Sequence, residues 1–130
     1  MPLNAKQIES VLALPGPKRY SHFIKEVADK QEVWGLYDEG WALAGSDEGE
    51  ELFLIWPAKE YAALRAIDDW AHYQPSAIPL EEFMDVLVPG LEADGLLPGV
   101  FYTPSGQGVV LTFSQLLEDL RHELGRYMKW

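Results

Sequence analysis

Residues 1–30 show apolar positions that recur with the period of an α-helix. Asn4, with Gln7 three residues later, has the pattern of a capping box, and Pro15–Pro17 ends the helix that begins there. A second helix follows, in which apolar residues are spaced by three and four positions: Tyr20, Phe23, Ile24, Val27 and Ala28. The chain is therefore predicted to begin with two helices.

From residue 32 the pattern changes to that of β-strands. The segments Glu32–Tyr37, Trp41–Ala44 and Glu51–Trp56 are predicted to form three strands, and the first two are joined by the turn Asp38–Gly40. Gly40 is expected to supply the positive φ angle that a short hairpin loop requires. Consecutive strands with such short connections predict a three-stranded antiparallel meander.

The segment after the third strand is predicted to be mostly helical. Pro57 suits the first position of a helix, whose inward side would carry Tyr61, Leu64, Ile67 and Ala71. Residues 73–79 are predicted to be a loop. A short helix then begins near Leu80 and ends before Pro89.

The C-terminal part is predicted to be a hairpin followed by a helix. Gly99–Thr103 and Gly108–Thr112 form the hairpin, and Ser114 caps a last helix with an inward leucine stripe. Helices precede, separate and follow two antiparallel groups of strands, so we predict an α+β fold: an antiparallel sheet, made of the meander plus the C-terminal hairpin, flanked by helices. Residues 1–130 are expected to form one domain, because the length suits one core and no linker interrupts the chain.

The charge is strongly negative and unevenly placed. Twenty-one acidic residues against ten basic ones give a net charge of −11, and residues 31–119 contain seventeen of the acids with only Lys59 and Arg65 as bases. This argues against binding to nucleic acid or to an anionic membrane surface, and favours a basic protein partner. A simpler interpretation is that acidity serves solubility. Without a signal peptide or an apolar run long enough to span a membrane, a cytoplasmic location is expected.

No catalytic or metal-binding motif is recognisable. The chain has no cysteine, no phosphate-binding glycine loop and no nucleophile elbow, and its three histidines are not spaced as metal ligands. Asp68 and His72 share a helical face but are too few to hold a metal. We therefore expect no cofactor, no metal and no assignable catalytic residue.

Five tryptophans are the more unusual feature. Trp34, Trp41 and Trp56 lie in or next to the predicted strands. They belong either to the core between sheet and helices or to an exposed recognition face. In the second case, Asp38 and Glu39 would lie beside them and add negative charge.

Several segments together resemble a known family, the bacterial domain of unknown function family 2750. The resemblance runs through Lys18–Tyr20, Glu32–Leu36, Asp38–Leu43 and Trp56–Pro57, and continues through Leu80–Phe83, Pro89–Glu92 and the closing helix. It covers nearly the whole chain. The resemblance implies a small bacterial, cytoplasmic, single-domain protein, and it implies no catalytic residues.

Two functional hypotheses follow. The first is a non-enzymatic binding or regulatory module that recognises a basic protein partner, or forms a homodimer, through Trp34, Asp38, Glu39, Trp41 and Trp56. The alternative is a small enzyme or ligand-binding protein with a site made of carboxylates and histidine, such as Asp68, His72 and a distant acid. A deep pocket that contains a histidine or a carboxylate with a strongly shifted pKa would favour the alternative.

Overall fold

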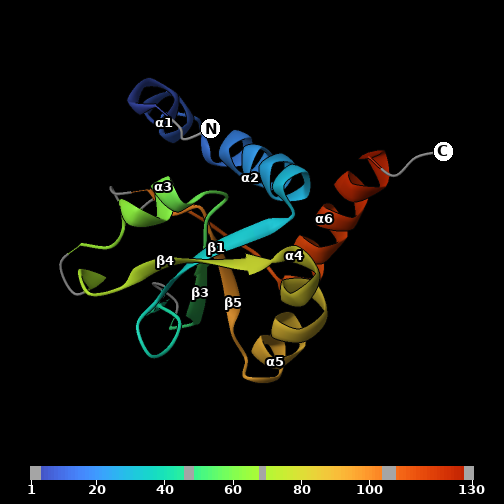
Figure 1. Ribbon diagram of the computed structural model, residues 1–130. Helices are drawn as coiled ribbons and strands as arrows, with labels where there is room; N and C mark the ends of the chain where they lie inside the picture. The colour runs from blue at the N-terminus through green and yellow to red at the C-terminus, as the bar shows by residue number, and fades with distance from the viewer. Residues whose placement is uncertain (1–3, 46–48, 68–69, 104–107, 128–130) are drawn as a thin grey trace.

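Two helices begin the chain in the computed structural model, which describes residues 4–45, 49–67, 70–103 and 108–127 (Figure 1). Helix α1 (Ala5–Leu12) starts at the predicted capping box: the Gln7 backbone N–H donates to Asn4 Oδ1 at 2.8 Å, and the Asn4 N–H donates to Gln7 Oε1 at 3.0 Å. None of its residues is buried. Helix α2 (Gly16–Lys30) buries the predicted apolar stripe and packs against the C-terminal helix α6 (Phe113–Tyr127).

A two-stranded antiparallel sheet follows, formed by β1 (Glu32–Tyr37) and β4 (Gln74–Pro79). The prediction of a loop at residues 73–79 is wrong. Pro75 and Pro79 favour a loop in the sequence, because proline lacks the N–H that most strand positions need. Trp34 exchanges both backbone hydrogen bonds with Trp56, so the N–H and C=O of Trp34 point away from β4. The backbone N–H and C=O groups of residues 74, 76 and 78 in β4 therefore point toward β1. Pro75 and Pro79 lie at the alternate positions, where a backbone N–H would point away from β1, so the N–H that proline lacks is not needed for pairing.

The second sheet has four strands in the order β2 (Leu43–Gly45), β3 (Glu51–Ile55), β5 (Leu97–Val100) and β6 (Val109–Val110). β2 is antiparallel to β3, and β5 and β6 form the predicted hairpin. β5 runs parallel to β3, a pairing that the meander prediction does not contain. β1 pairs with β4 and not with β2, and isolated bridges join Tyr37 to Trp41 and Trp34 to Trp56. The α+β class is confirmed, with a different arrangement of the strands.

Local geometry departs from the predictions at three further places. Helix α3 (Lys59–Ala63) is short, and Leu64 and Ile67, which were predicted to point inward, are 36% and 45% exposed. In the turn after β1 the positive φ belongs to Glu39, at 58°, and not to Gly40. The last helix also starts differently, because Thr112 Oγ1, not Ser114, accepts the N–H of Gln115 at 3.1 Å.

The helix after β4 continues through Pro89 instead of ending before it. It consists of α4 (Leu80–Glu82), a π-helical turn η2 (Phe83–Leu87) and α5 (Val88–Ala93). In a regular α-helix, a proline removes a hydrogen bond and its ring clashes with the carbonyl four residues earlier. In η2 the Val88 N–H donates to the Phe83 carbonyl, five residues back, and this wider turn accommodates Pro89.

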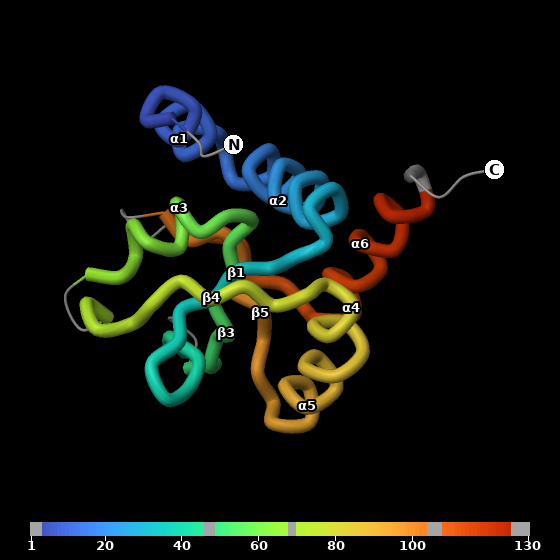
Figure 2. The backbone as a smooth tube through the Cα atoms, viewed as in Figure 1, coloured from blue at the N-terminus to red at the C-terminus, as the bar shows by residue number. Residues whose placement is uncertain are grey.

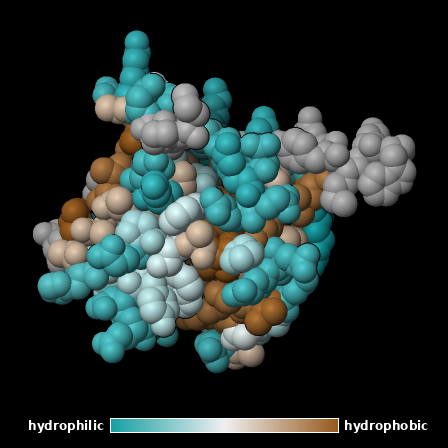
Figure 3. Space-filling model, in the orientation of Figure 1, coloured by the Kyte–Doolittle hydropathy of each residue, from teal (hydrophilic) through white to brown (hydrophobic). Residues whose placement is uncertain are grey.

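One hydrophobic cluster lies between the helices and the sheets. Its largest fully buried side chains are Trp56, Phe23, Phe53, Phe83, Phe101 and Phe113. Hydrophobic side chains also show on the surface where α4, η2 and α5 lie (Figure 3), and Val86 of η2 is 66% exposed. None of the helices in the described part of the chain is long and apolar enough to cross a membrane.

Candidate functional site

The three tryptophans that the sequence singles out lie in different environments. Trp56 is completely buried, and its indole N–H donates to the Tyr102 carbonyl at 2.9 Å. It belongs to the core and is not available to a partner. Trp34 is half-buried, and its indole N–H donates to Glu32 Oε1 at 3.2 Å.

Trp34 and Trp41 lie on opposite faces of the sheet. Trp34 is bridged directly to Trp56, so these two side chains share a face. The ring of Trp41 contacts Phe53 with 5.8 Å between centroids, and Phe53 lies three positions before Trp56, on the other face of the strand. The structure therefore does not bring the three tryptophans together on one surface.

Trp41 instead joins Tyr37, Asp38 and Glu39, and we call these four residues the aromatic–acidic turn. The rings of Tyr37 and Trp41 meet edge to face, with 5.0 Å between centroids and an interplanar angle of 73°. Tyr37 is 43% exposed, Trp41 is half-buried, and both acidic residues are exposed. The turn between β1 and β2 projects from the body of the molecule (Figure 2, lower left).

The local sequence explains how the Trp41 ring comes close to the backbone of β1. Gly35 has no side chain, and a Cβ placed there would lie 3.0 Å from the Trp41 ring, closer than side chains normally approach. The turn closes with hydrogen bonds from the Asp38 N–H to the Gly40 carbonyl at 2.9 Å and from the Ala42 N–H to the Leu36 carbonyl at 2.8 Å. Glu39 adopts a left-handed conformation that is uncommon for residues other than glycine.

The aromatic–acidic turn has the chemistry that recognises a basic side chain. Aromatic faces attract guanidinium and ammonium groups, and carboxylates bind them through charge-assisted hydrogen bonds. The molecule shows the first of these contacts elsewhere, where Arg65 lies over the Trp70 ring at 5.2 Å from its centroid. Within the described ranges, neither Asp38 nor Glu39 forms an ion pair with the protein's own bases.

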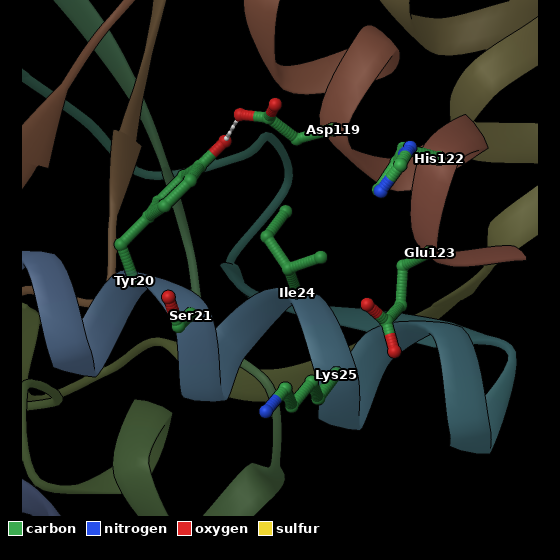
Figure 4. Close-up of a pocket in the computed structure, with 7 residues that line it drawn as sticks. All are labelled: Tyr20, Ser21, Ile24, Lys25, Asp119, His122 and Glu123. Carbon is green, nitrogen blue, oxygen red and sulfur yellow. Dashed lines mark hydrogen bonds between the residues drawn. The ribbon is translucent and has the colours of Figure 1, made fainter. Parts of the chain in front are cut away.

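A cleft of about 290 Å³ lies between α2 and α6, with Ile24 at its floor (Figure 4). The Tyr20 hydroxyl donates to Asp119 Oδ2 at 2.6 Å, and Gln115 Nε2 donates to Asp119 Oδ1 at 3.0 Å. Burial, followed by the bond to Asp119, raises the pKa of Tyr20 far above its ordinary value of 10. Both carboxylate oxygens of Asp119 thus accept a hydrogen bond, and the bond from Tyr20 links α2 to α6.

The alternative hypothesis expects a histidine site that includes Asp68 and His72. Asp68 lies outside the described residues, and His72 is exposed. His122 is also exposed, whereas His22 is half-buried. Among the side chains that the structure describes, no group of three His, Asp or Glu residues is arranged to hold a metal ion.

Tyr37 is not among the five residues assigned above to the recognition face, although its place beside the tryptophans made it a candidate. The signal was present, because Tyr37 is the last residue of a strand and directly precedes Asp38 and Glu39.

A model of the family described as "Protein of unknown function (DUF2750)" matches residues 20–120. No curated protein and no solved structure matches the chain. Since the match covers well over half of its length, the chain belongs to the DUF2750 family of proteins of unknown function.

Proposed function

We propose that the protein is a non-enzymatic binding module that recognises a basic segment of a protein partner through the aromatic–acidic turn. The observation that carries the proposal is the pairing of Tyr37 with Trp41, both open to solvent in part, beside Asp38 and Glu39. An arginine or lysine of the partner would contact an aromatic face and a carboxylate at once.

The charge of the whole chain supports the same kind of partner. A net charge of −11 attracts basic proteins over distances comparable to the Debye length, about 8 Å at physiological salt. Such steering speeds association more than it strengthens the complex. The affinity would therefore depend mainly on the two aromatic rings, and its salt dependence on the acids.

A bacterial cytoplasmic location is part of the proposal. The family resemblance supports it, and a chain without cysteines needs no oxidising compartment for its stability. The aromatic–acidic turn could also serve as the contact between two copies of the chain in a homodimer. This dimer would place Tyr37 and Trp41 of two copies against each other, with the acids of both copies close together, which like-charge repulsion disfavours.

The test is an NMR titration of the ¹⁵N-labelled full chain with a lysine- and arginine-rich decapeptide. We expect saturable shifts of the amides of residues 37–41 and of the Trp41 indole N–H, with binding that weakens as salt is raised. Trp41→Ala should weaken binding about tenfold, as the loss of a central aromatic contact does at other interfaces.

The matched control is Trp70→Ala, which removes a half-buried tryptophan outside the turn. It should leave the peptide affinity unchanged. Shifts spread over all acidic surfaces, or equal weakening by both variants, would show that the turn is not the binding site. A dimer in sedimentation measurements that Trp41→Ala dissociates would replace the basic partner by a second copy of the chain.

A further inference from the structure

A groove of about 420 Å³ lies between α1, α2 and α3, and none of the residues of the aromatic–acidic turn lines it. Helix α1 contributes mostly polar side chains and Val11, α2 contributes His22 and Glu26, and α3 contributes Tyr61. His22 and Glu26 are four residues apart and therefore lie on the same face of α2. The volume falls in the range of small-molecule sites.

His22 and Tyr61 converge because both rings pack on Phe101. The ring centroids of Tyr61 and Phe101 are 4.7 Å apart, and those of His22 and Phe101 are 6.3 Å apart. Phe101 is completely buried at the end of β5, and its N–H donates to the Ile55 carbonyl at 2.8 Å. The sheet thus supplies a rigid platform under the two side chains.

Asn4 and Gln7 bond to each other in the capping box, but three other polar side chains of the groove form no hydrogen bond within the described residues. Tyr61 is only 2% exposed, yet its hydroxyl forms no hydrogen bond with any residue that the structure describes. The same holds for the ring nitrogens of His22 and the carboxylate of Glu26 within those ranges. The hydroxyl itself still reaches solvent, since it is not among the buried side-chain atoms that lack a partner in the described residues, and it can therefore bond to water or to a ligand in the groove.

The charge states of these groups define what the groove would accept. Burial lowers the pKa of His22 below its usual value of 6.5. The negative charge of Glu26 raises this pKa and the positive charge of Lys25 lowers it, and burial is the largest of the three effects. The imidazole is therefore neutral at pH 7. Burial, Glu26 and Glu60 raise the pKa of Tyr61 to about 12, so this side chain is a neutral phenol. The groove therefore offers a carboxylate, one acceptor nitrogen and an aromatic ring.

We infer that this groove binds a small organic amine, whose ammonium group is held by the Glu26 carboxylate and the free imidazole nitrogen of His22, while its carbon skeleton lies against Tyr61. Lys6, which also lines the groove, and Lys25 carry the opposite charge, but both are exposed and screened by water and salt, whereas Glu26 is half-buried. A carboxylate ligand would be repelled by Glu26, and a neutral alcohol would gain no charge-assisted hydrogen bond.

The experiment compares three probes of similar size with the full chain: 2-phenylethylamine, 2-phenylethanol and 3-phenylpropanoate. NMR titration should show the amine shifting amides of α1, α2 and α3, with an affinity about tenfold higher than that of the alcohol, because a charge-assisted hydrogen bond is gained. Glu26→Gln should abolish this preference. Glu9→Gln, an exposed acid of α1 that does not line the groove, should preserve it.

Lowering the pH gives a second readout. Protonation of His22 removes its acceptor nitrogen and adds a repelling charge, so amine binding should fall as the pH drops through the lowered pKa of His22. The groups that face His22 are Glu26 and Lys25 of α2, Lys6 of α1 and Tyr61 of α3. His22→Gln, which keeps an acceptor but does not titrate, should remove this dependence. Equal affinity for amine and alcohol, or an amine preference that survives in Glu26→Gln, would overturn the inference.

Discussion

Trp56 and Trp41 are two residues of the same type in neighbouring parts of the chain, and their surroundings are opposite. Trp56 directly follows β3, is bridged to Trp34, and is fully buried and hydrogen-bonded to the Tyr102 carbonyl. Trp41 lies beyond the turn, in contact with Tyr37 and Phe53, and is only half-buried. Pairing partners far away in the sequence, and not the residue type, decide which tryptophan supports the fold and which is available for binding.

This contrast predicts a large difference in stability. Trp56→Ala should lower the free energy of unfolding by about 3–5 kcal/mol, because it leaves a cavity in the core and an unpaired carbonyl. Trp41→Ala should lower it by about 1–2 kcal/mol, since much of that ring is already in contact with water. Urea unfolding measures both. Equal losses would mean that Trp41 is as much a core residue as Trp56.

The hydrogen bond between Tyr20 of α2 and Asp119 of α6 allows a test of whether the stability of the fold and the binding of the peptide are independent. Tyr20→Phe removes the hydroxyl that donates to Asp119 and should lower the free energy of unfolding by about 1.5–3 kcal/mol, as expected for a hydrogen bond to a charged group. Binding of the basic decapeptide at the aromatic–acidic turn should not change. A loss of peptide affinity in the folded variant would contradict the assignment of binding to the turn alone.

The smallest expected effect concerns His22. Since burial lowers its pKa below 6.5, the unfolded chain takes up the proton first. The stability that His22 contributes is present above pH 6.5 and is lost as the pH falls through the lowered pKa. In thermal unfolding between pH 7 and pH 5, His22→Gln should lose less stability than the wild type. His122→Gln, at an exposed histidine, should follow the wild type.

Much of the fold follows from local patterns, and the errors occur where distant residues decide. The stripe of α2 and the capping box at Asn4 are predicted correctly because each depends on neighbours within a few positions. β4 was missed because its prolines are compatible with a strand only when their positions face away from β1. The passage of a helix through Pro89 likewise depends on a π-helical turn that no residue pattern indicated.

The candidate site divides in the same way. The sequence places Asp38 and Glu39 in a turn, and the structure has them there, exposed. It does not distinguish Trp56 from Trp41, because burial of Trp56 depends on the pairing of β3 with β5 and on the bridge to Trp34. The groove at His22 was missed for a related reason: the His22–Glu26 spacing is visible in the sequence, but Tyr61 and Phe101 are brought there only by the fold.

The most direct test of the central claim compares two charge reversals that change the net charge equally. Asp38→Lys/Glu39→Lys alters the turn, and Glu92→Lys/Asp94→Lys alters exposed acids at the end of α5. Peptide affinity is measured for both, after urea unfolding has shown that their stabilities match within about 0.5 kcal/mol, as expected for surface positions. The account predicts that only the first variant loses the basic decapeptide. Equal losses in both would show that the overall charge, and not the aromatic–acidic turn, attracts it.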